Sequence, residues 1–199
     1  MNGIRSWVSP SPLLLVSLFL CAFTPAAHAH PVPKRFHDRL ITVHLTPQAV
    51  RVEYHLEADA WTVVYVDLPA VNDQVDLTKL TQPKDFYESY ARVYAPILAN
   101  NLTATLGGKP LAFRCTKHGW QDKDSIWCDY VFEAPWQPAA GSRQDFTFRE
   151  GNYELEAGQI KLSLVADSGV TLLEKTEPDE ALKNRPATEL RPGDDARLR

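Results

Sequence analysis

The chain has 199 residues, of which 44% are hydrophobic and 23% are charged, and its formal net charge is −4. This composition is ordinary for a globular protein with a single core, and the excess of acidic residues argues against nucleic acid as a partner. We therefore expect one folded domain followed by a tail.

The first 29 residues have the three zones of a secretory signal. Arg5 supplies the basic start, an apolar run extends from Leu13 to Phe23, and Ala27-His28-Ala29 supplies the small residues of a cleavage site. The apolar run is shorter than the roughly 20 residues that span a bilayer. We predict a cleaved signal peptide over residues 1–29, a mature amino terminus at His30, and a periplasmic or extracellular location.

The next residues alternate between apolar and polar on both sides of Thr46-Pro47-Gln48. This alternation predicts a β-hairpin. Its buried face would carry Ile41, Val43, Leu45, Val50, Val52, Tyr54 and Leu56. The following stretch, AWTVVYVDLPAV (residues 60–71), is rich in β-branched and aromatic side chains and predicts another buried strand.

Apolar side chains recur at three- and four-residue steps after Pro83. This spacing predicts one helix over about residues 83–99. Because Pro96 lacks an amide hydrogen, we expect the helix to kink or end near Tyr94. Gly107-Gly108 then predicts a tight turn between strands, and short alternating runs continue beyond it.

These elements favour a mainly β fold. We predict an immunoglobulin-like antiparallel β-sandwich over residues 30–174, with one helical excursion. From about Glu174 onward the chain consists mostly of charged residues and prolines. Residues 175–199 are therefore predicted to form a charged, flexible tail or linker without a core of its own.

The mature chain keeps two cysteines, Cys115 and Cys128, because Cys21 leaves with the signal. An even number of cysteines in an oxidising compartment favours a disulfide. If the two faced each other across antiparallel strands, Arg114 would oppose Asp129, which is a compatible pair. A zinc or redox site would need further ligands or a C-x-x-C spacing. We predict a structural disulfide.

Cleavage before His30 would place a free α-amine beside an imidazole, and these two nitrogens could chelate Ni, Co or Cu ions. His37 is the nearest candidate for a further ligand. His44 or His55 could join only if the amino terminus folded back over the hairpin. In the alternative interpretation, these histidines and His118 are solvated polar residues, and no metal is bound.

Motifs of common enzymes are absent from the sequence. It contains no G-x-S-x-G, P-loop, G-x-G-x-x-G or H-E-x-x-H pattern. We therefore predict that the protein is not an enzyme. A secreted enzyme that holds copper through an amino-terminal histidine is a further alternative, and it would require two more nitrogen ligands.

Three stretches carry a family resemblance: HPVPKRFHDR, YAPILANNLTATLGGKPL and FREGNYEL. They resemble the extracytoplasmic amino-terminal domain of bacterial nickel/cobalt-permease-like or hydrogenase/urease-accessory-type membrane transporters, over most of residues 30–195. The resemblance implies a periplasmic β-sandwich that a polar linker tethers to membrane helices. This sequence ends before any such helices, so it is either the soluble part of a longer product or a domain to which the permease relation does not apply.

Together these observations predict an exported, non-catalytic accessory domain for the transport of nickel or cobalt. Its expected partners are a membrane permease segment or subunit and a transition-metal ion. The alternative is a structural or protein-interaction module of the periplasm without any metal.

Overall fold

The computed structural model describes residues 36–137, 143–154, 156 and 158–176. The predicted signal peptide, His30 and most of the predicted tail lie outside these residues. The strands are β1 (His37–Leu45), β2 (Ala49–Ala58), β3 (Leu102–Leu106), β4 (Lys109–Leu111), β5 (Arg114–Asp122), β6 (Ile126–Pro135), β7 (Phe146–Glu150) and β8 (Ile160–Ala166).

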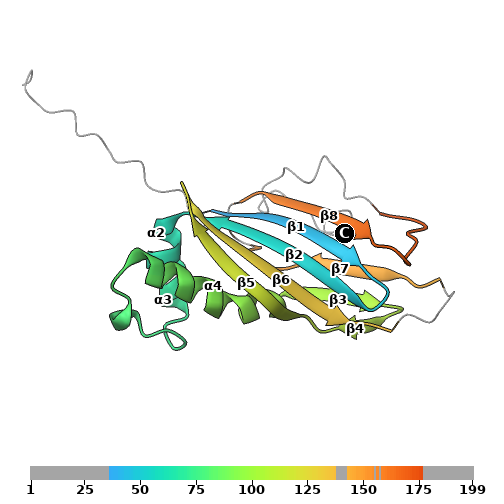
Figure 1. Ribbon diagram of the computed structural model, residues 1–199, viewed down its shortest axis with the longest axis horizontal. Helices are drawn as coiled ribbons and strands as arrows, with labels where there is room; N and C mark the ends of the chain where they lie inside the picture. Colours follow the sequence, from blue (N-terminus) through green and yellow to red (C-terminus); the bar gives the residue numbers. More distant parts are fainter. Residues whose placement is uncertain (1–35, 138–142, 155, 157, 177–199) are drawn as a thin grey trace, which may run out of the picture. The chain divides into compact units, whose positions relative to one another are not determined.

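The strands form two sheets that face each other (Figure 1). One has the order β5-β6-β2-β1-β8, and the other has the order β4-β3-β7. The helical elements are α2 (Ala60–Thr62), η1 (Val63–Asp67), α3 (Leu68–Ala70), η2 (Leu77–Lys79) and α4 (Pro83–Asn100). The predicted mainly β sandwich with a helical excursion is confirmed.

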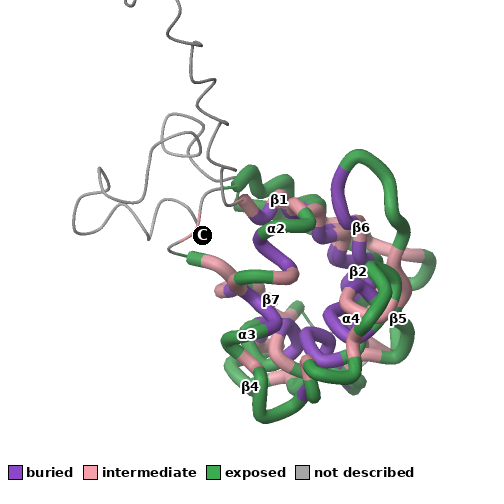
Figure 2. The backbone as a smooth tube through the Cα atoms, turned by 90° about the vertical axis from the view of Figure 1, so that its left-hand side faces the viewer, coloured by how far each residue is buried: buried purple, intermediate pink, exposed green. Residues whose placement is uncertain are grey.

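The predicted hairpin is confirmed as β1 and β2, with His44 opposite Arg51 and His55 opposite Leu40. Its apolar side chains belong to the buried core, and buried residues alternate with more exposed ones along both strands (Figure 2). Tyr54 packs edge-on against Phe132 of the neighbouring strand β6. The alternation of the hairpin residues is therefore the pattern that builds one wall of the core.

One strand departs from the predicted antiparallel arrangement. β8 pairs with β1 in parallel, with Arg39 opposite Ile160 and Leu45 opposite Ala166. Between β1 and β8 the chain forms the strands of the second sheet. This long crossover connection allows β8 to run in the same direction as β1. The prediction of an antiparallel sandwich is wrong for this pair of strands, whereas the other described strand pairs are antiparallel.

The predicted strand over residues 60–71 was also wrong, because this stretch is helical. The Asp59 side chain caps its start by accepting a hydrogen bond of 2.9 Å from Thr62 N. Thr62, Val63, Asp67 and Leu68 are buried, and their steps of four and five residues place them on one helix face, in contrast to the alternation of a strand. Tertiary packing here outweighs the β propensity of the valines.

The predicted helix is confirmed as α4. It begins with a reciprocal capping arrangement between Gln82 and Asp85. The helix was predicted to kink or end near Tyr94, and it does not end there but continues through Pro96 to Asn100. Because Leu98 is buried in the core, packing of the last turn offsets the backbone hydrogen bond that the proline removes.

The predicted turn at Gly107-Gly108 is confirmed between β3 and β4. Both glycines have positive φ angles, +54° and +76°. This is the backbone conformation that a two-residue hairpin turn requires, and glycine adopts it without steric cost.

Candidate functional site

The helical insertion, residues 60–80 between β2 and α4, directs one carboxylate into the protein. The π-helix η1 ends at Asp67, which is 3% exposed, whereas Tyr65 on the same element is 67% exposed. π-Helical turns are rare and occur frequently at functional sites. A buried carboxylate also requires hydrogen-bond donors.

The donors to Asp67 come from different elements. Nε2 of His37, on β1, lies 2.8 Å from Asp67 Oδ2, and the hydroxyl of Tyr90, on α4, donates to the same oxygen at 2.9 Å. The Tyr94 hydroxyl donates to the Asp67 backbone carbonyl at 3.0 Å. His37 and Tyr90 are both 0% exposed. One carboxylate therefore fastens the insertion to a strand and to a helix.

Tyr153, which follows β7, covers the other side of the histidine. Its ring stacks on His37 with 3.8 Å between centroids, and its hydroxyl lies 3.1 Å from that of Tyr90. Tyr153 has a φ of +53°, a left-handed conformation that costs a residue other than glycine about 1–2 kcal/mol. Such strain persists only where surrounding contacts enforce it. We call His37, Asp67, Tyr90 and Tyr153 the buried cluster.

A buried ion pair adjoins this cluster. Arg39 Nη1 lies 3.1 Å from Glu150 Oε2, and the two side chains are 2% and 5% exposed. The other carboxylate oxygen of Glu150 accepts a hydrogen bond of 3.1 Å from the Tyr54 hydroxyl. The Arg39 guanidinium also lies 5.8 Å from the centroid of the Tyr153 ring. This pair joins the first sheet to the end of the second.

Burial sets the protonation of the tyrosines. It raises the pKa of Tyr90 and Tyr153 well above the usual value, and neighbouring acidic and phenolic groups add to the effect. Burial, followed by the charge of Glu150, likewise raises the pKa of Tyr54. These hydroxyls therefore stay neutral and act as hydrogen-bond donors.

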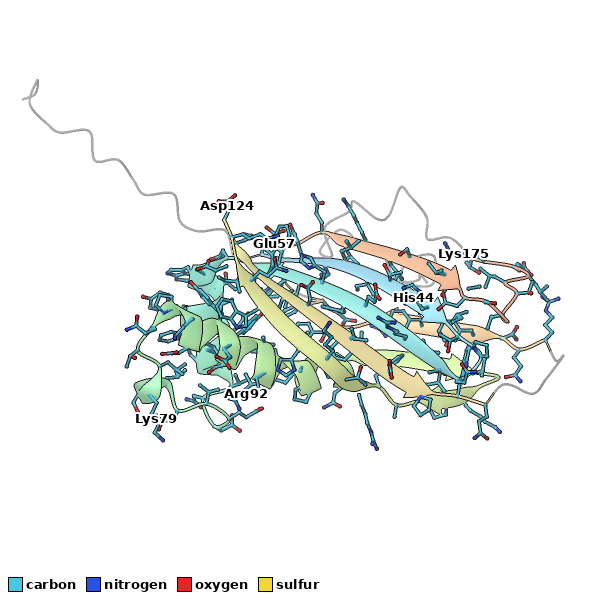
Figure 3. The ribbon with its side chains drawn as sticks, viewed as in Figure 1. His44, Glu57, Lys79, Arg92, Asp124 and Lys175 are labelled. Atoms are coloured by element: carbon cyan, nitrogen blue, oxygen red, sulfur yellow. The ribbon has the colours of Figure 1, made fainter. Side chains whose placement is uncertain are left out.

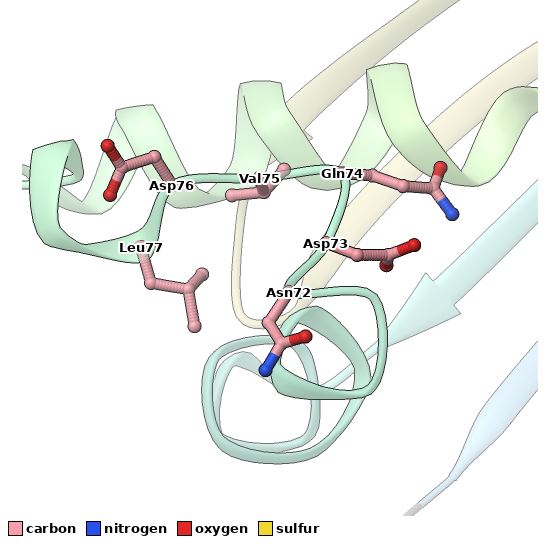
Figure 4. Close-up of a pocket in the computed structure, with 6 residues that line it drawn as sticks. All are labelled: Asn72, Asp73, Gln74, Val75, Asp76 and Leu77. Atoms are coloured by element: carbon pink, nitrogen blue, oxygen red, sulfur yellow. The ribbon is translucent and has the colours of Figure 1, made fainter.

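Within the buried cluster, His37, Asp67 and Tyr90 are closed to solvent and Tyr153 is partly buried. Two hollows on the described surface lie elsewhere. One is formed by the loop from Asn72 to Leu77 (Figure 4). Asp76 of this loop accepts hydrogen bonds from the following residues Thr78 and Lys79, which lower its pKa to about 2. Its carboxylate is therefore already hydrogen-bonded to neighbouring residues of the same turn. The other hollow lies between α4 and β5, beside Pro96 and His118. Neither exposes the cluster to a substrate.

Of the two predicted metal ligands, His30 lies outside the described residues, and His37 is buried against Asp67. His44, on the outer face of β1 (Figure 3), lies 3.3 Å from Asp167, and His55 lies 2.7 Å from Asp129. Among the described residues, no three His, Cys, Asp or Glu side chains gather closely enough to hold a metal ion.

The predicted cysteine pairing is also not observed. Cys115 lies opposite Phe132 and Cys128 lies opposite Trp120, and both thiols are free. The predicted register was wrong because the β5–β6 hairpin turns near Asp124 and contains a bulge between Cys115 and Lys117. Trp120 packs against Tyr87 of α4, and this contact helps to fix the observed register. The structure thus gives no support for a disulfide.

Sequence reasoning missed Asp67, Tyr153 and the Arg39–Glu150 pair. The inward orientation of His37 and Arg39 could have been predicted. They lie four and two residues before Ile41, so in an alternating strand all three side chains point to the same face. Extending the pattern backward would have placed both polar side chains in the interior. Asp67 could not be found in this way, because its stretch was interpreted as a strand.

No known protein family matches this sequence, and no curated protein is significantly similar to it. Within the described part of the chain, no helix is both long and apolar enough to cross a bilayer.

Replacing Asp67 should be far more harmful than replacing an exposed partner of a histidine. We expect Asp67→Ala to lower the free energy of unfolding by about 3–5 kcal/mol, because it leaves buried donors without their acceptor. Asp129→Ala removes the carboxylate from a pair in which that side chain is 55% exposed, and should cost at most about 1 kcal/mol. Urea unfolding of the two variants measures both values, and equal losses would contradict the assigned role of Asp67.

The buried tyrosines should make the fold sensitive to alkali. Their pKa values are raised in the folded state, so their contribution to stability is complete below the unfolded value near pH 10 and declines as the pH rises above it. Burial also raises the pKa of Tyr130 well above its usual value. We expect Tyr54, Tyr90, Tyr130 and Tyr153 to ionise together with unfolding. Absorbance at 295 nm and circular dichroism, recorded against pH, will test this. Gradual ionisation of all tyrosines without loss of structure would contradict it.

Proposed function

We propose that the protein is an exported, non-catalytic binding domain that recognises a protein partner through the outer side of its helical insertion. The observation that carries this proposal is a pair of exposed aromatic residues. Trp61 is 44% exposed and Tyr65 is 67% exposed, and their rings lie 5.9 Å apart. Tryptophan and tyrosine are enriched among the residues that dominate protein-binding energies.

The opposite side of the insertion supports this proposal, because it holds the aromatic pair in place. Asp67 anchors η1 to His37 and Tyr90, and Leu68 of α3 is fully buried. A surface that is rigid before binding loses less conformational entropy when the partner docks. The buried cluster therefore contributes to binding by positioning the insertion and not by touching the partner.

A catalytic role has less support. The titratable pair of the buried cluster, His37 and Asp67, is 0% and 3% exposed, and a general acid or base must reach the proton that it transfers. This agrees with the lack of enzyme motifs in the sequence.

A crosslinking experiment in the native host tests the aromatic surface. A photo-reactive phenylalanine derivative at Tyr65 should give a discrete adduct with an envelope protein. The same derivative at Thr103, an exposed residue of β3, serves as the control and should give none. Adding Trp61→Ala should reduce the Tyr65 adduct at least about tenfold, as expected for a residue worth more than 1.4 kcal/mol, with an unchanged urea midpoint. Equal adducts at both positions would refute the proposal.

The transporter resemblance supports a narrower form of this proposal, in which the partner is a nickel or cobalt permease and His30 binds the ion with its α-amine. His37 is not expected to contribute, because its Nε2 is hydrogen-bonded to Asp67. Titration of the processed protein with Ni(II), Co(II) and Cu(II) should show binding that one additional residue before His30 abolishes. His37→Gln should leave the affinity unchanged. Equal affinity of the processed and extended chains would refute the metal site.

A further inference from the structure

Strand β8 exposes apolar side chains that its register assigns to the interior. Ile160 and Leu162 lie opposite Arg39 and Ile41, whose side chains are buried. They should therefore face the core, yet they are 52% and 48% exposed. β8 is the last strand of the five-stranded sheet and lies at its edge (Figure 1). The inner face of the sheet is therefore open to solvent at this edge.

The backbone of β8 is also available for pairing. Gln159 C=O accepts a hydrogen bond from Arg39 N–H. Because successive peptide groups alternate in direction, residues 160, 162 and 164 point their N–H and C=O groups away from β1. Among the described residues, no strand pairs with this side of β8. An edge with free backbone groups and apolar side chains is suited to receive another strand.

The opposite edge of the same sheet is protected. β5 has a β-bulge between Cys115 and Lys117, and it also carries the exposed cations Arg114 and Lys117. Bulges and charges are common devices that prevent unwanted strand pairing. β8 is regular over its seven residues, and Lys161 is its only charged residue. The difference marks β8 as the edge that is open to a partner.

We propose that β8 pairs with β8 of a second copy of this chain, antiparallel and centred on Ser163. Centring on Ser163 overlaps all seven residues of both strands. Leu162 would then lie opposite Leu164 of the partner copy, and Lys161 would lie opposite Val165, so that no like charges face each other. The two five-stranded sheets would become one continuous sheet related by a twofold axis.

The segments of this chain outside the described residues fit the edge less well. Residues 177–199 are dominated by charged side chains and prolines, and the HPVPKR segment before β1 has two prolines, which cannot donate hydrogen bonds to a strand ladder. Seven residues on each side are fewer than the roughly 20–30 of a standard interface. The dimer is therefore expected to be weak, with a Kd on the order of micromolar. It does not depend on the proposed function, because β8 is separate from the aromatic pair.

Cysteine crosslinking tests the pairing in the full chain. Ser163 directs its backbone toward β1, so it would form a non-hydrogen-bonded pair with its own copy, with Cα atoms about 4.5 Å apart. In a background of Cys21→Ser, Cys115→Ser and Cys128→Ala, Ser163→Cys should form a disulfide-linked dimer under mild oxidation. Lys161→Cys, on the same face of the same strand, should crosslink at least about tenfold more slowly, because the two Lys161 positions would lie about four residues apart along the sheet.

Light scattering of the otherwise unaltered chain provides a second measurement. The mass should rise toward that of a dimer near 100 μM, which is roughly a hundredfold above a micromolar Kd. Leu162→Lys should abolish this rise, whereas Thr103→Lys on the other sheet should not. A monomer at all concentrations, or equal crosslinking of the two cysteine variants, would overturn the proposal. A full chain that stays monomeric while a chain truncated after Lys175 dimerises would also overturn it, and would identify the tail as the occupant.

Discussion

The hydrogen bond between His37 and Asp67 holds together elements that no backbone ladder connects. It joins the first strand of the sandwich to the helical insertion, and Tyr90 extends the connection to α4. A carboxylate that is 3% exposed loses its hydration and must be compensated by donors. The insertion can therefore occupy this position only while these donors are in place, and the strained backbone of Tyr153 is enforced by the same contacts.

The Arg39–Glu150 pair complements this interaction at the same end of the core. Along most of the sandwich the two sheets meet through apolar side chains, but here they meet through buried charges. Apolar contacts are non-directional, whereas hydrogen-bonded charges require specific geometry. The polar end of the core therefore fixes where the insertion lies, and the apolar part supplies most of the driving force for folding.

The parts of the fold that depend on local periodicity could be predicted from the sequence. The hairpin, α4 and the Gly107-Gly108 turn each follow from spacing within a short stretch. Three features depended on distant contacts instead. These are the helical conformation of residues 60–71, the parallel pairing of β8, and the β5–β6 register set by Trp120 and Tyr87. The candidate site shares this limit, because Asp67 and Tyr153 meet His37 only after the chain has folded.

Two forms of binding are proposed, one of a protein partner at the aromatic pair and one of a metal ion at the amino terminus. The burial of His37 limits the ligands of the second. A metal at the amino terminus would have to rely on His30 and its α-amine, since the imidazole of His37 already interacts with Asp67. His44 and His55 lie on the outer face of the sheet, and each is paired with a carboxylate. A two-nitrogen chelate leaves most of the coordination sphere of such an ion to water or to another protein. Both proposals include a partner protein, and the aromatic pair on the insertion is the surface that we propose for its contact.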